Sequence, residues 1–311
     1  MIKKLISIIA SIMPNFIKLS LYRLIGYKIG KNVKIGFMTL ILANEVKIED
    51  NVKIGSLNFF RMNKLSIGRN SIIRSLNMML GPKNLKLGKR IQIVGPFVFM
   101  NLVEDIELDD GCGIGSHSIF YTHGVYLPYT EGHPRKLGKI YLGKRVWSTC
   151  HVIFLPGASI GDDSIITPGS VVNGFFPKDS LISGNPAKII SKASNLKMVM
   201  TKEKLYGRMK EILLDFKGNN FLENAQTNVE GDELRIKKNK NKYLIKLQNG
   251  KKIENIQDYK EIIILGENLT KVNHKKISLF DFKERKMILK GELSKIFLDY
   301  LGTYGEYFNE E

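Results

Sequence analysis

Two histidines lie close together in a segment that interrupts an otherwise regular sequence. His123 and His133 fall between residues 119 and 141, in the sequence IFYTHGVYLPYTEGHPRKLGKIY, and Glu131 and Arg135 accompany them. An imidazole titrates near neutral pH, so it can take a proton from a hydroxyl group and return one to a leaving group. Segments that leave a rigid scaffold often carry function. This one is therefore a candidate site for acid–base chemistry.

The interrupted pattern is a repeat of six residues. Between Leu142 and Val171 the chain reads LGKRVW, STCHVI, FLPGAS, IGDDSI and ITPGSV, with a mostly large first position and a small or β-branched fifth position. A short motif of this repeat recurs every 18 to 21 residues, except that the gap across the histidine-bearing segment is 34. The motif begins at Ile29, Ile48, Ile67, Leu87, Leu108, Leu142 and Ile160.

Six residues per unit and three units per turn predict a parallel β-solenoid with a triangular cross-section. Strand side chains alternate between faces, so a corner between positions one and five points both of them inward. Gly, Asn and Asp at the second to fourth positions permit the corners. A helix is excluded because the apolar spacing is six rather than 3.6. We expect an all-β solenoid over residues 28–190, with an extruded loop at 120–139.

The sequence on either side of the repeat has a different character. Residues 1–27 are basic and apolar, and we expect an N-terminal helical cap, broken near Pro14, over the open end of the first coil. Residues 191–218 have the pattern of a helix and linker, and the polar run 224–232 also reads as linker. Short strand patterns and a terminal amphipathic helix predict a small C-terminal α+β module over 219–311, whose role the sequence does not indicate.

The net positive charge of the chain is large, but by itself it does not identify the binding partner. The net charge is +18, which suits a nucleic acid, an anionic membrane surface or a polyanionic ligand. No nucleic-acid-binding motif accompanies the charge, so we expect no nucleic acid partner. The apolar run Leu5–Met13 is too short to span a bilayer. An alternative role for the N-terminal segment is peripheral contact with the inner membrane face, through Lys3, Lys4, Lys18 and Arg23.

The cysteines and histidines do not predict a metal site or a disulfide framework. The two cysteines, Cys112 and Cys150, both lie inside six-residue units, and a cytoplasmic protein is consistent with this usage. A zinc site built from His117, His123 and His151 lacks the expected spacing. A nucleophilic role for Cys150 is disfavoured because adjacent strand residues, here Cys150 and His151, point to opposite faces.

The repeat and the motifs around its interruption resemble the left-handed β-helix, or hexapeptide-repeat, acyltransferases. The nearest branch is that of the sugar and polysaccharide O-acetyltransferases. The resemblance covers residues 15 to about 190 and depends on an aromatic-Thr-His sequence before a loop and on the segments GKRVW, LPGASIGD, PGSVV and GNPAK. It implies a left-handed parallel β-helix, a homotrimer with intersubunit active sites, acetyl-CoA bound between neighbouring prisms, and no metal.

The resemblance places the family's catalytic histidine at His123. As a general base it would remove the acceptor hydroxyl proton during attack on the thioester, and no acyl-enzyme is needed when both substrates are held together. The carboxylate that orients His123 is open among Glu104, Asp105 and Glu131. The oxyanion donor is also unidentified, because Phe97 stands where the galactoside branch has an asparagine. Residues of the loop expected to contact the acceptor are Tyr121, Glu131, His133 and Arg135.

The resemblance also implies a coenzyme-binding set. The segments that line the pantetheine arm match Trp147, Thr149, Cys150, Pro168 and Gly169, and a basic position near the nucleotide phosphates matches Lys188. Two departures from the family pattern affect this set. Pro168 lacks the amide N–H often found at its position, and Ser148 puts a hydroxyl at an inward position.

The expected function is therefore transfer of an acetyl group from acetyl-CoA to a hydroxyl of a cell-surface saccharide, such as a precursor of capsule, O-antigen or exopolysaccharide. Two alternatives stay open. An N-acetyltransferase acting on an amino sugar or small amine would use the same histidine, and a non-catalytic β-helix would act as a binding scaffold. The sequence identifies neither the acceptor sugar nor the hydroxyl.

Overall fold

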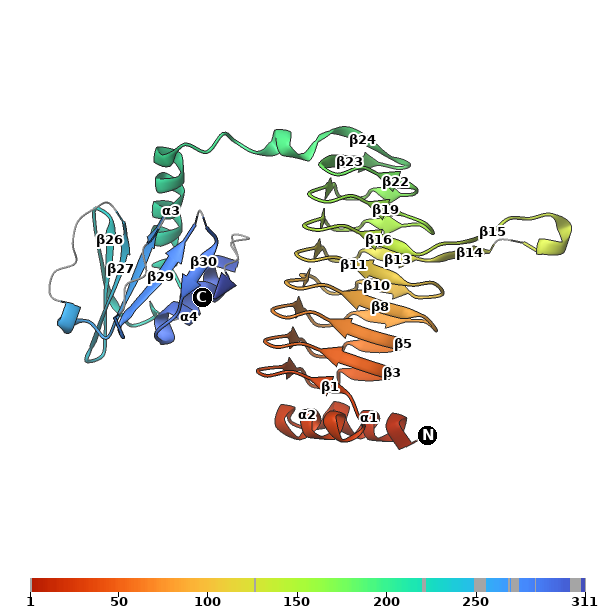
Figure 1. Cartoon of the computed structure of the whole chain (residues 1–311), viewed down its shortest axis with the longest axis horizontal. Helices are drawn as coiled ribbons and strands as arrows, with labels where there is room; N and C mark the ends of the chain where they lie inside the picture. The colour runs from red at the N-terminus through yellow and green to blue at the C-terminus, as the bar shows by residue number, and fades with distance from the viewer. Residues whose placement is uncertain are drawn as a thin grey trace. The chain divides into compact units, whose positions relative to one another are not determined.

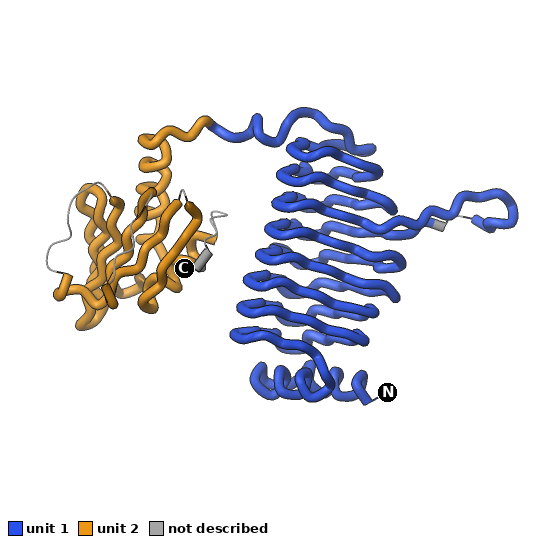
Figure 2. Tube along the Cα trace, in the orientation of Figure 1, with its two compact units in different colours: residues 1–198 blue, residues 199–311 orange. Residues whose placement is uncertain are grey.

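The chain divides into two units, residues 1–198 and residues 199–311 (Figure 2). The computed structural model describes residues 2–125, 127–219, 222–248, 256–267, 269, 274–282, 284–302 and 309–310. Within these residues, no helix is both long enough and apolar enough to cross a membrane. The first unit is a left-handed parallel β-helix with an N-terminal helical cap, which confirms the predicted fold class (Figure 1).

One face of the β-helix is a ladder of two-residue strands that ends in a longer hairpin. Each strand pairs in parallel with the equivalent strand of the next coil, and the last pair is antiparallel. In stacking order the strands are β2 (Lys34–Ile35), β4 (Lys53–Ile54), β6 (Ile72–Ile73), β9 (Gln92–Ile93), β12 (Gly113–Ile114), β17 (Trp147–Ser148), β20 (Ile165–Ile166), β23 (Ser180–Gly184) and β24 (Ala187–Lys192).

The other two faces are joined in the early coils and separate later. β1 (Lys28–Ile29) pairs with β3 (Leu40–Ile48), and β3 and β5 (Phe59–Ile67) run through both faces as continuous strands. The second face then continues through β7 (Met78–Leu80), β10 (Phe99–Asn101), β13 (Ile119–Tyr121), β18 (Ile153–Phe154) and β21 (Val171–Val172). The third continues through β8 (Asn84–Leu87), β11 (Ile106–Leu108), β16 (Ile140–Leu142), β19 (Ser159–Ile160) and β22 (Phe175–Phe176).

The core consists of inward rows in which each side chain meets its counterpart in the next coil. Phe120 and Phe154, for example, are both fully buried and stack with ring centroids 4.3 Å apart. On the first face the inward row is Ile35, Ile54, Ile73, Ile93, Ile114, Ser148, Ile166 and Ile182. Ser148 interrupts this aliphatic row with a buried hydroxyl.

At the corners between faces, residues adopt the left-handed backbone conformation with positive φ, which costs energy for residues other than glycine. The corner before the first face carries Asn32, Asn51, Asn70, Arg90, Gly111, Arg145, Asp163 and Asp179. The corner after that face carries Met38, Leu57, Leu76, Phe97, His117, His151 and Gly169. These positions give the two edges opposite characters, because the first column is polar and the second is mostly apolar or aromatic.

Two helices close the end of the prism where the first coil lies. α1 (Ile2–Ile12) and α2 (Asn15–Leu24) lie against β1, β2 and β3 (Figure 1). The Asn15 side chain donates to the carbonyl oxygen of Val33 (3.1 Å) and accepts from the N–H of Ile35 (2.8 Å), as a neighbouring strand would. Lys18 is fully buried and donates to the carbonyl oxygens of Ile35 and Gly36.

The burial of Lys18 corrects one expectation from the sequence. Lys18 was grouped with the basic residues expected at a membrane surface, but its ammonium group faces the first coil and not solvent. Burial also lowers the pKa of Lys18 below its ordinary value. Its role in the structure is to satisfy carbonyl groups that have no coil beneath them.

The far end of the β-helix and the second unit differ in detail from the sequence-based interpretation. Residues 191–201 were expected to be helical, but the helix α3 (Lys202–Phe216) begins later, after β24 and the short η2 turn (Ala193–Leu196). The polar run 224–232 was expected to be linker and instead contains β25 (Gln226–Glu230), which pairs with the next strand. Polar composition concealed a strand whose side chains are mostly exposed.

The second unit is one sheet covered by two helices. β25 is followed in the sheet by β26 (Glu233–Lys238), β27 (Asn241–Leu247), β28 (Glu261–Gly266), β29 (Ile277–Asp281), β30 (Lys286–Ile288) and β31 (Asn309–Glu310). A short η4 turn (Ile256–Asp258) precedes β28. α3 and α4 (Glu292–Leu301) share one apolar cluster with the sheet, in which Phe216 packs edge-on against Phe297.

Replacing Lys18 with alanine tests its role at the prism end. The substitution removes a buried aliphatic stem and leaves two carbonyl groups without their donor, so we expect a loss of about 2–4 kcal/mol in the free energy of unfolding. Chemical denaturation of Lys18→Ala measures this loss. Lys28→Ala, at an exposed position of the same coil, is the control and should change stability by less than about 0.5 kcal/mol.

The pH dependence of stability provides a second measurement on the same residue. The folded pKa of Lys18 is lowered, so the unfolded chain binds the proton more tightly than the folded chain. Stability should therefore rise as pH increases through the interval between the lowered folded value and the ordinary value of 10.5. Lys18→Met should lack this rise. An equal slope in both proteins would contradict the burial of a charged ammonium group.

Candidate active site

A hairpin leaves the β-helix at the corner between the second and third faces, which we call the third corner, where the sequence repeat is interrupted. The corner after the first face is the second corner. The hairpin consists of β14 (His123–Val125), β15 (Arg135–Leu137) and the η1 turn (Tyr129–Glu131), and it projects to one side of the prism (Figure 1). β14 and β15 are antiparallel, with His123 opposite Leu137. The coil resumes at β16 in register with β11, so the hairpin is an addition to an intact coil.

The residue before His123 fixes the base of this hairpin. Thr122 is fully buried, and its hydroxyl donates to the carbonyl oxygen of Asn101 (2.8 Å) and accepts from the N–H of Glu104 (2.9 Å). Its carbonyl oxygen accepts from the N–H of Gly138 on the returning strand (3.0 Å). His123 therefore starts from a backbone that is bound both to the preceding coil and to the returning strand.

The imidazole of His123 has an unsatisfied nitrogen. Its Nδ1 atom is buried and forms no hydrogen bond within the described residues, although the side chain as a whole is only partly buried. A buried polar atom without a partner costs about 1–3 kcal/mol, and most such atoms in folded proteins are paired. The ring thus lacks, within the described residues, the Nδ1 partner that would fix its orientation.

The carboxylates considered as partners of His123 have other contacts. Glu104 lies 3.7 Å from the Lys83 ammonium group, and Asp105 accepts from the side chain and backbone of Asn84. Glu131 lies 3.9 Å from Nε2 of His133. In the part of the chain that the structure describes, no hydrogen bond joins any of them to His123.

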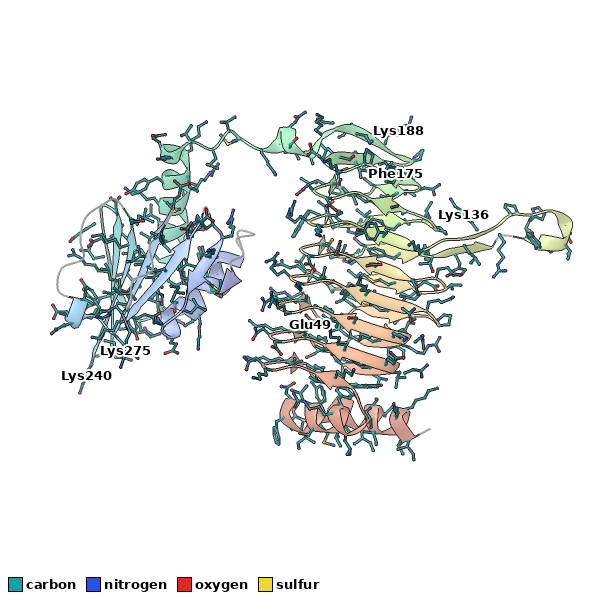
Figure 3. All side chains as sticks on the ribbon, in the orientation of Figure 1. Glu49, Lys136, Phe175, Lys188, Lys240 and Lys275 are labelled. Carbon is teal, nitrogen blue, oxygen red and sulfur yellow. The ribbon has the colours of Figure 1, made fainter. Side chains whose placement is uncertain are left out.

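The tip of the hairpin is open to solvent and its base is fixed. Glu131 and Arg135 are exposed, whereas His133 is partly buried. Lys136, labelled in Figure 3, donates to the side-chain oxygen of Asn173 (2.8 Å). Asn173 lies at the third corner, between β21 and β22. This contact was not predicted from the sequence, because it joins residues 37 positions apart. It holds β15 against the corner of a later coil.

Tyr121 lies outside the hairpin, at the end of β13. It is partly buried and packs edge-on against Phe99, with ring centroids 6.2 Å apart. The hairpin residues Glu131, His133 and Arg135 were grouped with Tyr121 as acceptor contacts. The structure gives them different surroundings, since Tyr121 belongs to the wall of the prism.

Five residues of the expected coenzyme set lie together at the second corner. The hydroxyl of Thr149 donates to the carbonyl oxygen of Ile166 (2.8 Å), and the N–H of Gly169 donates to the carbonyl oxygen of Cys150 (3.3 Å). These bonds stack the segment Trp147–Cys150 directly on the segment that contains exposed Pro168 and Gly169. Lys188 is exposed on β24, at the last coil (Figure 3).

Trp147 occupies a space that a glycine leaves open. Gly113 is the partner of Trp147 in the ladder, and a Cβ atom at Gly113 would come within 2.1 Å of two carbons of the indole ring. The indole can therefore lie flat over the preceding coil while remaining 40% exposed. This arrangement makes Trp147 an aromatic surface beside the second corner.

The structure separates His123 from the Trp147 group by one face of the prism. His123 lies at the third corner, after β13, whereas Trp147 lies on β17 and Thr149 and Cys150 follow it at the second corner, before β18. The strands between these corners are β13, β18 and β21. A single copy of the chain consequently displays the two groups on different edges.

Histidine and cysteine side chains nearby have structural surroundings. His117 and His151 are exposed at the second corner and stack with ring centroids 4.7 Å apart, and Phe97 lies 5.2 Å from His117. Cys112 donates to the carbonyl oxygen of Gly143, and burial raises the pKa of its thiol to about 12. Among the described residues, no three histidine, cysteine or acidic side chains are placed to hold a metal.

Comparison with known sequences points to acetyltransferases. No family model matches the chain. A putative acetyltransferase of Staphylococcus aureus is 37% identical over 114 residues, which cover 36% of this chain and 57% of the relative. The galactoside O-acetyltransferase of Escherichia coli is 35% identical over 101 residues, covering 29% of this chain and 47% of the relative. The chain thus spans about half the length of these curated relatives.

Among solved structures, a hexapeptide-repeat acetyltransferase of Vibrio cholerae in complex with acetyl-CoA covers 61% of this chain and 84% of its own, at 20% identity and a TM-score of 0.34. The fold of the first unit rests on the strand pairing described above. The β-helical unit is therefore similar in part of its sequence to acetyltransferases, and its six-residue repeat and parallel ladders form a left-handed β-helix.

Proposed function

We propose that this protein is an O-acetyltransferase that moves an acetyl group from acetyl-CoA to a hydroxyl group of a saccharide. The observation that carries the proposal is the unpaired, buried Nδ1 atom of His123 at the base of the hairpin. Nδ1 itself is covered, so its lack of a partner indicates a missing orienting group, and a substrate would meet the partly exposed remainder of the ring. The sequence relatives named as acetyltransferases support the reaction class.

The proposed reaction is a direct transfer with His123 as general base. The imidazole takes the proton of the acceptor hydroxyl while its oxygen forms a bond to the thioester carbonyl carbon. The tetrahedral intermediate then collapses, the carbon–sulfur bond breaks, and the imidazolium returns the proton to the leaving thiolate. The protein's own contribution is positioning, because the bonds of Thr122 fix the backbone from which the ring projects.

The separation of the two groups supports a site shared between copies of the chain. His123 and Trp147 lie on edges divided by one face of the prism, so a substrate that contacts both needs a second copy whose opposite edge adjoins the first. A closed homotrimer supplies this arrangement three times, because each edge of one type meets an edge of the other type. We include the trimer in the proposal.

The remaining parts of the proposal concern the coenzyme and the location. Trp147, Thr149, Cys150 and Gly169 would line the pantetheine arm, and Lys188 would pair with a phosphate group. Pro168 would contribute its ring and carbonyl group, since it has no N–H to donate. The acceptor would be a cell-surface saccharide precursor, met in the cytoplasm or at the inner membrane face, and the C-terminal module keeps an unassigned role.

Replacement of His123 tests the base. His123→Ala should lower the rate of acetyl-CoA-dependent transfer about 10²–10⁴-fold, because proton removal would fall to water. CoA release in the presence of saccharide acceptors measures the rate, and mass spectrometry identifies the acetylated product. His274→Ala, in the second unit, is the control and should retain most activity. Unchanged turnover in His123→Ala, with the assembly intact, would remove His123 from the mechanism.

Mixing two inactive variants tests whether sites are shared between copies. We expect His123→Ala and Trp147→Ala homo-oligomers each to be impaired, and mixed oligomers to regain activity, because some of their sites receive His123 from one copy and Trp147 from another. Co-expression with two different affinity tags isolates the mixed species. If these show no activity above the two parents, both residues serve the same site within one chain.

Gly113 provides a separate test of the aromatic surface. A methyl group at Gly113 would overlap the Trp147 ring, so Gly113→Ala should displace the indole and raise the KM for acetyl-CoA about tenfold, equivalent to roughly 1.4 kcal/mol of binding. Steady-state kinetics measure this effect. Gly207→Ala on α3 has open space around the new methyl group and is the control. Equal KM values in the two variants would argue against coenzyme binding at Trp147.

A further inference from the structure

The N-terminal helix turns its apolar residues away from the protein. The side chains concerned follow the spacing of one helix face and form what we call the α1 stripe, consisting of Ile2, Leu5, Ile8, Ile9 and Ile12. Their exposed fractions run from 43% for Ile9 to 73% for Ile2. A helix that packs on a core normally buries such a face. The α1 stripe is therefore a continuous apolar surface at the end of the β-helix.

The opposite side of α1 is made of small residues that lie against the prism. Ser7, Ala10 and Ser11 are buried, and the hydroxyl of Ser7 has no hydrogen-bond partner in the described part of the chain. Small side chains let the helix approach the first coil closely. Burial of an unpaired hydroxyl beside exposed isoleucines is unfavourable in water on both counts. This orientation is favourable when a further apolar phase covers the stripe.

Backbone contacts fix the orientation of α1. The N–H of Met38, at the second corner of the first coil, donates to the carbonyl oxygen of Ser11 (2.8 Å). The hydroxyl of Ser11 donates in turn to the carbonyl oxygen of Ile8 (2.7 Å). Rotation of the helix to bury the α1 stripe would break the bond from Met38 and expose the seam of small residues. The stripe faces outward as a consequence of the fold.

The charge around the stripe selects the kind of surface that can cover it. Residues 1–44 include no aspartate or glutamate and include seven lysines or arginines. Lys18 is buried, and the other six side chains are exposed, namely those of Lys3, Lys4, Arg23, Lys28, Lys31 and Lys34. Exposed cationic side chains on the same end of the prism as an apolar helix face match a bilayer surface that contains anionic lipids. A second copy of the same cationic end would meet like charge instead.

We propose that the α1 stripe inserts into the interfacial region of an anionic membrane and attaches the β-helix to it by its N-terminal end. α1 has 11 residues, about 16 Å of helix, which is roughly half the hydrocarbon thickness, so it lies along the surface. This inference deepens the membrane location included in the proposed function. It does not depend on acyl transfer, because it rests on α1 and the first coil alone.

Vesicle binding by the full chain tests the inference. We expect the protein to co-sediment with vesicles of phosphatidylcholine and phosphatidylglycerol and to bind pure phosphatidylcholine much more weakly. The double substitution Ile8→Glu and Ile12→Glu should lower the partition coefficient at least about tenfold, because it places two charges in the face that would enter the membrane. The matched control, Leu196→Glu with Val199→Glu, changes two exposed apolar residues far along the chain and should bind like the original protein.

Charge reversal and solution measurements complete the test. Lys3→Glu with Lys4→Glu should also weaken binding to the anionic vesicles, and added salt should weaken binding of the original chain. Absence of vesicle binding, or equal binding by the Ile8/Ile12 variant, would overturn the inference. Self-association in sedimentation runs without lipid, abolished by the same variant, would assign the stripe to a second copy instead.

Turnover with a soluble saccharide acceptor, measured on the same proteins, separates this inference from the proposed function. The Ile8/Ile12 variant should retain turnover while it loses vesicle binding. His123→Ala should retain vesicle binding while it loses turnover. If the Ile8/Ile12 variant still binds vesicles, the membrane inference fails, whereas if His123→Ala still turns over, the proposed function fails.

Discussion

Every coil of the β-helix is bound to the next at equivalent positions, and this register governs the rest of the first unit. Each inward side chain meets its own counterpart, so a residue type that suits one coil must suit its neighbours. The buried amides show how strict this is. Asn58 accepts from both the backbone and the side chain of Asn77, and Asn77 accepts from the N–H of Val98 in the following coil. These buried amides keep their hydrogen-bond partners only if the register between successive coils is maintained.

The same register explains why the candidate base lies on a hairpin. Extra residues inserted within a strand would shift all later rows, whereas residues inserted at a corner leave the ladder intact. The N–H of Ile140 donates to the carbonyl oxygen of Asp105, in the preceding coil, as it would if residues 122–139 were a normal corner. His123 thereby gains a position outside the core while its backbone stays attached to it. The placement combines a rigid base with an open surface, which suits a group that binds two substrates.

The features that follow from the repeat could be predicted from the sequence, whereas features that depend on a single contact could not. Aliphatic and glycine spacing located the strands, the corners and the excursion that begins near His123. It could not show that Lys136 reaches Asn173, or that Lys18 is buried, because neither belongs to a repeating row and both depend on partners distant in the chain. The strand β25 was missed for a related reason: its exposed polar residues carry no apolar alternation. Paired backbone, not side-chain burial, defines that strand.

At the ends of the prism, the backbone N–H and carbonyl groups of the outermost coil have no further coil with which to form hydrogen bonds. At the first coil no strand lies beneath, and side chains replace it: the amide of Asn15 binds Val33 and Ile35, and the ammonium group of Lys18 binds the carbonyls that follow. Both residues belong to α2, so the cap supplies polar groups inward from one helix. α1 then needs only small residues against the coil, and its isoleucines are left on the outside. The outward apolar face thus follows from how the first coil is sealed.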